Sequence, residues 1–239
     1  MGKLIEIQNL TISLNERCLY NDINLSINEE DRFIFLGPNG AGKSLLLELI
    51  ALGYSEYLTK KYKGLSVSGR ILNKNGEDLL EPSTERNTIS FISQKDEFYN
   101  NSSILDEAET ACHGIGLELD VEKLEILLNR FGINKNTKTK IKNGFSNGEE
   151  KLIHIITKLL LFPKADLFLM DEPLNHLSFQ NSKVFNDILV EMINEKPNLS
   201  IIMVSHCRAV CFAQKAISFK ADKTLKTTDF VPYDCFTHG

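Results

Sequence analysis

The sequence has no apolar run that approaches the roughly 20 residues a membrane-spanning helix needs. Its longest apolar stretches, such as residues 167–170 and 201–204, are only long enough for strands. The N-terminal segment also lacks the apolar core of a signal peptide. We therefore expect a cytoplasmic protein, which would work at a membrane only peripherally, on its cytoplasmic face and through a partner.

Basic residues are not in excess, and cysteines are few. The 27 Lys and Arg residues are outnumbered by 32 Asp and Glu residues, giving a formal net charge of −5. Because a general nucleic-acid binder depends on basic surface, we expect no direct nucleic-acid binding. The five cysteines are odd in number and scattered, which disfavours a disulfide framework and favours a reducing compartment.

Short apolar strands alternate with helices along the 239 residues, which is typical of an α/β fold with a largely parallel sheet. Apolar and polar alternation, or compact apolar runs, predict strands at 3–14, 23–27, 32–36, 71–72, 89–93, 167–170 and 199–204. From about residue 103 to 161 the helical period dominates. This helical section is therefore expected as an insertion between strands of the sheet.

Residues 37–44, Gly-Pro-Asn-Gly-Ala-Gly-Lys-Ser, fit the phosphate-loop pattern GxxxxGK[ST] between a predicted strand and a predicted helix. Glycines let successive backbone N–H groups point at phosphate oxygens, and the following helix presents its positive end. The lysine can reach the β- and γ-phosphates, and the serine hydroxyl can ligate Mg²⁺. The alternative is a glycine-rich turn with an incidental lysine. We predict nucleotide contacts from Gly37, Pro38, Asn39, Gly40, Ala41, Gly42, Lys43 and Ser44.

A second candidate feature is the pair Asp171 and Glu172, which follows the apolar run 167–170 and precedes Pro173. A strand ending in two carboxylates places both at the carboxyl edge of the sheet, where ligands bind in open α/β folds. Asp171 is predicted to hold Mg²⁺, and Glu172 to polarise the attacking water as general base. The alternative is an ordinary acidic turn closed by the proline.

Five motifs, taken in order, resemble those of ATP-binding cassette (ABC) ATPases over nearly the whole chain. They are the phosphate loop, Gln94 after a strand, the signature-like Phe145-Ser-Asn-Gly-Glu149, the acidic strand end and His206 after a strand. The resemblance implies a P-loop NTPase core with a mostly parallel sheet, N-terminal antiparallel strands and an inserted helical subdomain. It further implies one ABC domain over 1–239, with the nucleotide-binding core at 1–96 and 166–239 and the helical signature subdomain at 97–165.

The resemblance also implies roles for individual residues. Gln94 would sense Mg²⁺ and the attacking water, and His206 would contact the γ-phosphate. Ser146 and Gly148 would act in trans, capping the γ-phosphate held by a second ABC ATPase chain in a head-to-tail dimer. Ser146 and Glu149 also fit a helix capping box, and both interpretations can hold together.

The chain departs from the family pattern at positions that concern the base or the dimer interface. Asn147 and Glu149 replace the usual Gly and Gln of the signature, and Ser178 stands where an interface Asp is expected. Leu14 occupies the register of the aromatic that stacks on adenine, while Tyr20 is nearby but out of register. We expect Leu14 to give apolar contact with the base without stacking.

The resemblance implies an Mg²⁺-dependent ATP-binding and ATP-hydrolysing subunit of an ABC transporter. It would dimerise on ATP, as a homodimer or a heterodimer, and drive a separate membrane-spanning permease. A soluble non-transport ABC ATPase, regulatory or ribosome-associated, is the alternative, faintly favoured by residues 173–177 and 205–208. A module that binds ATP without turnover is disfavoured by Glu172 and His206.

Overall fold

The computed structural model describes residues 2–94, 98, 102–142, 144–205, 212–219 and 224–230. The strands are β1 Lys3–Leu14, β2 Arg17–Asn28, β3 Arg32–Leu36, β4 Leu65–Asn73, β5 Ile89–Ile92, β6 Leu167–Asp171, β7 Ser200–Val204, β8 Lys215–Phe219 and β9 Leu225–Asp229. The helices are α1 Lys43–Leu52, α2 Glu56–Lys61, α3 Ile104–His113, α4 Val121–Arg130, α5 Asn147–Leu159 and α6 Phe179–Glu195. Within these described ranges, no helix has both the length and the apolarity to span a membrane.

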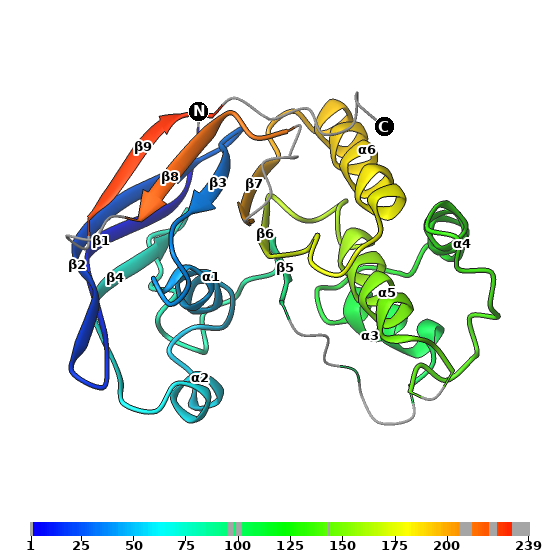
Figure 1. The fold of residues 1–239 in the computed structure, drawn as a ribbon, viewed down its shortest axis with the longest axis horizontal. Coiled ribbons are helices and arrows are strands. Elements are labelled where there is room, and N and C mark those ends of the chain that lie inside the picture. The colour runs from blue at the N-terminus through cyan, green and yellow to red at the C-terminus, as the bar shows by residue number, and fades with distance from the viewer. Residues whose placement is uncertain are drawn as a thin grey trace.

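The strands form two sheets. The larger has the order β5-β6-β7-β3-β8-β9, with β5 to β8 parallel and β9 antiparallel at one edge. The smaller sheet, β2-β1-β4, is antiparallel. Figure 1 shows the antiparallel sheet on one side of the molecule and helices α3 to α6 on the other. The predicted α/β class, with a mostly parallel sheet and N-terminal antiparallel strands, is confirmed.

The central strands are covered on both faces, because their side chains alternate between two apolar clusters. In β6, Phe168 and Met170 pack with helices α3 to α6, whereas Leu167 and Leu169 pack with α1 and the antiparallel sheet. All five residues of β6 and all five of β7 are buried. Fully burying a Leu, Ile, Phe or Met side chain contributes about 1.5–3 kcal/mol, so these strands form a stable platform.

This topology gathers several loops at one edge of the sheet. Because β3, β6 and β7 run parallel as neighbours, their carboxyl ends lie together. The backbone continues from β3 into residues 37–42, and β6 ends at Asp171, whose Cα is paired with that of Val204. The predicted phosphate loop and acidic strand end are therefore brought to the same place, 127 residues apart in sequence.

Candidate nucleotide-binding site

The phosphate loop joins β3 to α1 and requires glycine at two positions. Gly37 and Gly42 have φ angles of 154° and 91°, which L side chains rarely adopt. A Cβ at Gly42 would lie 2.8 Å from the ring of Tyr20, and one at Gly37 would lie 2.9 Å from Cβ of Phe219. The loop therefore packs against Tyr20 of β2 and Phe219 of β8, and its residues 38–40 are exposed.

Lys43, the first residue of α1, is folded over the loop. Its Nζ donates to the carbonyl oxygens of Gly37 at 2.8 Å and Pro38 at 3.0 Å. Burial lowers the pKa of this ammonium, and the nearby carboxylates of Glu172 and Asp171 oppose the shift. Among the described residues, the hydrogen bonds of this ammonium go to neutral carbonyls. The ammonium gains when phosphate oxygens replace these carbonyls, because charge-assisted hydrogen bonds are stronger.

Ser44 and Asp171 meet across the gap between α1 and β6. The Ser44 hydroxyl donates to Oδ1 of Asp171 at 2.9 Å, and Asp171 is almost fully buried. Burial raises the pKa of Asp171 to about 6, and the negative charges of Glu172 and Glu48 add to this, while the Ser44 hydrogen bond and Lys61 oppose it. The Asp171 carboxylate is therefore poorly compensated in the protein alone.

Such an arrangement fits Mg²⁺. A hydroxyl and a carboxylate are hard oxygen ligands, and Mg²⁺ is commonly held by one or two protein groups together with substrate phosphates. In the described part of the chain, no three His, Cys, Asp or Glu side chains cluster so as to hold a metal by themselves. The residues therefore suit a cation shared with a nucleotide.

Glu172 follows Asp171 with its backbone in the left-handed region, at φ 49°, and its N–H donates to the Val204 carbonyl at 2.9 Å. Its Oε2 accepts a hydrogen bond from Gln94 Nε2 at 3.2 Å and another from Asn175 Nδ2. A non-glycine residue in this conformation costs about 1–3 kcal/mol and is kept only when its surroundings fix it. The two amides and the strand contact thus hold the carboxylate at the sheet edge.

The signature segment begins α5 with a capping box. The Ser146 side chain accepts from the Glu149 N–H at 3.4 Å, and Glu149 Oε2 accepts from the Ser146 N–H at 2.8 Å and its hydroxyl at 2.9 Å. Lys135 Nζ lies 3.1 Å from Glu149 Oε1 and 4.4 Å from the Phe145 ring centre. The Ser146 backbone hydrogen bond is the largest cause of a lowered pKa at Glu149, and Lys135 also lowers it.

Comparison with known proteins places the chain. The family model for ABC transporters matches residues 20–175. The ergothioneine transport ATP-binding protein EgtV of Helicobacter pylori strain G27 is 30% identical over 93% of this chain and 100% of its own. The chain belongs to the ABC transporter family. Members of this family hydrolyse ATP. The predicted identity as a transporter ATP-binding subunit is confirmed. The relatives do not favour the soluble non-transport alternative.

Other relatives agree with this assignment. The phosphate import ATP-binding protein PstB of Saccharolobus solfataricus is 26% identical over 85% of this chain and 78% of its own. A solved ATP-binding subunit of an ABC transporter is similar in fold, with a TM-score of 0.77, at 20% identity, over 95% of this chain and 90% of that one.

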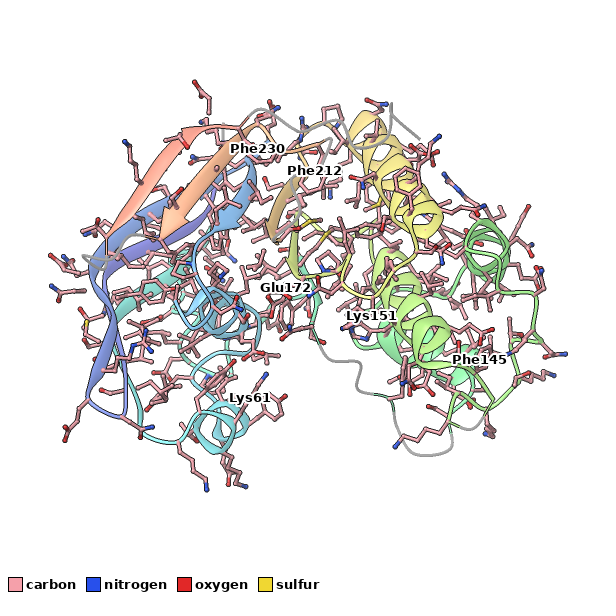
Figure 2. The ribbon with its side chains drawn as sticks, viewed as in Figure 1. Lys61, Phe145, Lys151, Glu172, Phe212 and Phe230 are labelled. Atoms are coloured by element: carbon pink, nitrogen blue, oxygen red, sulfur yellow. The ribbon has the colours of Figure 1, made fainter. Side chains whose placement is uncertain are left out.

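Most of the predicted site residues of this ABC subunit lie at one sheet edge. The phosphate loop, Asp171, Glu172 and Gln94 come together there, linked by the contacts given above. Ser146 and Gly148 are not part of this group, and Figure 2 shows the neighbouring Phe145 well apart from Glu172. His206 lies outside the described residues.

Leu14 and Tyr20 have different surroundings. Leu14 ends β1, is half-buried, and packs against the cluster beneath the antiparallel sheet. Tyr20 is buried under Gly42, and its ring meets that of Phe219 edge-on with centroids 5.5 Å apart. Its hydroxyl has no hydrogen-bond partner among the described residues, and burial raises its pKa well above 10. Tyr20 therefore supports the phosphate loop from within the core.

Sequence reasoning missed several residues beside the site. Asn175 lies three residues after Glu172, a turn spacing that gave a local signal for this contact. Glu48 lies one helical turn after Ser44, is buried, and pairs with Lys61 from α2 at 2.5 Å. The Glu48–Lys61 pair had no such signal, because α2 itself was not predicted.

Proposed function

We propose that this chain is the Mg²⁺-dependent ATP-hydrolysing subunit of an ABC transporter, bound peripherally to a membrane-spanning permease on the cytoplasmic face. The observation that carries the catalytic part is the pair of contacts Ser44–Asp171 and Gln94–Glu172 beside the phosphate loop. These contacts support a site in which Ser44 and Asp171 are metal ligands and Glu172 is an oriented carboxylate beside the phosphate loop. Relatives named as transport ATP-binding proteins support the permease partner.

In this proposal the loop N–H groups and Lys43 bind the β- and γ-phosphates, with Gly37 to Ser44 forming the cradle. Ser44 and Asp171 would hold Mg²⁺, with Gln94 as a further ligand, and the bound ion would neutralise charge on the phosphate oxygens. Lys43 exchanges the carbonyls of Gly37 and Pro38 for phosphate oxygens. His206 contacts the γ-phosphate, and Leu14 gives apolar contact with adenine.

Glu172 acts as the general base. Its Oε2 is already held by Gln94 and Asn175, so the carboxylate is oriented before a water molecule arrives. The water proton passes to Glu172 as the water oxygen attacks the γ-phosphorus. The bond from that phosphorus to the β–γ bridging oxygen breaks, and its electron pair leaves with ADP, so the products are ADP and phosphate. Gln94 touches the same carboxylate and positions the attacking water.

Ser146 and Gly148 serve a second ABC ATPase chain, which in the simplest case is another copy of this one. Ser146 and Asn147 are exposed, and a Cβ at Gly148 would meet nothing within 4 Å. The helix N-terminus at this point attracts anions. Glu149 is compatible with this role, because its carboxylate is turned back onto the cap and paired with Lys135.

The test is Glu172→Gln. The variant should bind ATP normally and hydrolyse it roughly 10²-fold more slowly, because the amide cannot accept the proton. It should also accumulate an ATP-bound dimer, measurable by size-exclusion chromatography with light scattering. Glu191→Gln, in an exposed ion pair with Arg130 far along α6, is the matched control and should keep wild-type turnover. Wild-type turnover in Glu172→Gln would remove Glu172 from the base role.

A further inference from the structure

Helix α5 carries a polar stripe where a core helix would ordinarily be apolar. Lys151, His154 and Lys158 share one face at helical spacing. The first two are only 5% and 6% exposed, although their neighbours on α5, such as Ile153 and Ile155, are ordinary core residues. This stripe faces the end of β5 and the residues that follow it.

Four contacts join helix α5 along this stripe to β5 and to the segment leading to Gln94. Ser90 Oγ donates to the Lys158 carbonyl at 3.3 Å, and Ser93 Oγ lies 3.3 Å from His154 Nε2. Lys151 Nζ donates to the carbonyl oxygens of Ser93 at 2.9 Å and Gln94 at 3.1 Å. The Lys151 ammonium therefore hydrogen-bonds to the backbone of Gln94, whose side chain contacts Glu172.

Burying an ammonium group in a protein core carries a desolvation cost that an apolar side chain does not. Removing a charge from water costs several kcal/mol unless hydrogen bonds compensate, and apolar replacements of buried charges are often neutral or stabilising. An isoleucine or leucine at position 151 would pack as its neighbours do, but it could not fix two backbone carbonyls. The lysine thus has a use that packing alone does not explain.

We propose that Lys151 is a positioning residue for hydrolysis, holding the Gln94 backbone so that the Gln94 amide reaches Glu172. This inference rests on the proposed catalytic role of Glu172. Lys151 also lies five residues after Ser146, the N-cap of the same helix, which is about 7.5 Å along the helix axis. Figure 2 shows Lys151 between Glu172 and the Phe145 end of α5.

These contacts connect the signature end of α5 to the proposed general base, Glu172. Ser146 caps α5, Lys151 on α5 binds the Gln94 carbonyl, and Gln94 binds Glu172. A shift of α5 when its N-terminus engages the partner's nucleotide would move Gln94 relative to Glu172. The chain's own hydrolysis would then respond to capping at the other site.

The first test uses turnover. Lys151→Met keeps the apolar stem and removes the ammonium, so the dissociation constant for ATP should change less than about twofold while kcat falls about tenfold. Lys151→Arg should recover much of the loss, because a guanidinium can still donate to both carbonyls. Lys158→Met is the matched control: it removes the half-buried ammonium of the stripe but keeps the carbonyl that binds Ser90, and it should stay within about twofold of wild type.

A double-mutant cycle separates positioning from simple destabilisation. In a Gln94→Ala background, Lys151→Met should cost little further kcat, because its effect passes through the Gln94 side chain. A full additional tenfold loss, or an equal loss in Lys158→Met, would overturn the proposal. Unchanged kcat in Lys151→Met would overturn it as well, whereas unchanged turnover in Glu172→Gln would instead overturn the proposed function.

A second readout needs no turnover. Backbone amide hydrogen exchange, measured by mass spectrometry on the nucleotide-free protein, should speed up at residues 89–94 in Lys151→Met, with Lys158→Met unchanged there. Exchange in 89–94 that is the same in Lys151→Met and wild type would show that the ammonium does not hold this segment and would contradict the inference.

Discussion

The phosphate-loop edge and the signature end of α5 differ in how far this chain completes them. At the first, Ser44 binds Asp171 and Gln94 binds Glu172. At the second, Ser146 is tied to Glu149 within its own helix turn and is exposed to solvent. In the first region, side chains from distant segments contact one another, as the proposed nucleotide site requires. In the second, the signature residues form a helix cap whose Ser146 faces solvent.

The largest expected effect comes from neutralising Asp171, the buried carboxylate at the phosphate-loop edge. Asp171→Asn should reduce Mg²⁺-dependent turnover by about 10²-fold or more, because the variant loses the buried carboxylate ligand. The same variant should be more stable without nucleotide. A carboxyl with a pKa of about 6 in the fold, against about 3.9 unfolded, binds its proton more tightly when folded, so stability falls as pH rises from about 4 through 6.

At pH 7.5 in EDTA, Asp171→Asn should therefore gain up to about 3 kcal/mol in free energy of unfolding, and at pH 4 almost nothing. The measurement is denaturant unfolding at both pH values. Asp166→Asn is the control with the opposite sign, because Lys74 and Lys196 pair with Asp166 and its pKa is lowered. A destabilised Asp171→Asn at pH 7.5 would show that the carboxylate is compensated without a metal.

A middle-sized effect concerns the signature charge. Lys135→Met leaves the Glu149 carboxylate without its cation beside the proposed phosphate position, so turnover should fall about three- to tenfold through a weaker dimer. Adding Glu149→Gln to Lys135→Met should restore turnover, since the repulsive charge is then gone. Concentration-dependent ATPase assays measure both, and a double variant as slow as Lys135→Met would contradict the compensation.

The smallest effect lies at the base. Leu14→Tyr should tighten ATP binding by about 0.5–1.5 kcal/mol by adding one stacking pair. Wild type should correspondingly prefer ATP over GTP only modestly in competition binding. Unchanged affinity in Leu14→Tyr would show that position 14 does not face the base.

The sequence predicted those elements whose geometry is specified by a short stretch of consecutive residues. The loop at 37–44 and the strand end at Asp171 were found because a motif and a buried run each specify their own geometry, and parallel pairing then brings them together. Helix α2 was missed because its six residues bury only Leu58, too few for a helical period. Strands β8 and β9 were missed because β9 carries mostly exposed polar residues, and its pairing with β8 defines both.

Contacts between distant segments had no local signal. Lys151 reads as a solvated helix residue in sequence, and only the packing of α5 against β5 turns it toward Gln94, 57 residues away. Tyr20 was considered near the adenine register, but in β2 its side chain is buried in the core under Gly42. Such placements depend on how the sheet and the helical section pack together.

Capping in trans is tested most directly by mixing two inactive variants before ATP is added and measuring ATPase activity. Glu172→Gln keeps the signature but lacks the base, whereas Ser146→Arg keeps the base but cannot cap. If each site takes its base from one chain and its signature from the other, mixed dimers contain one complete site, and ATPase activity should recover to about a quarter of wild type. A mixture as inactive as its separate components, beside an active wild type, would contradict capping in trans.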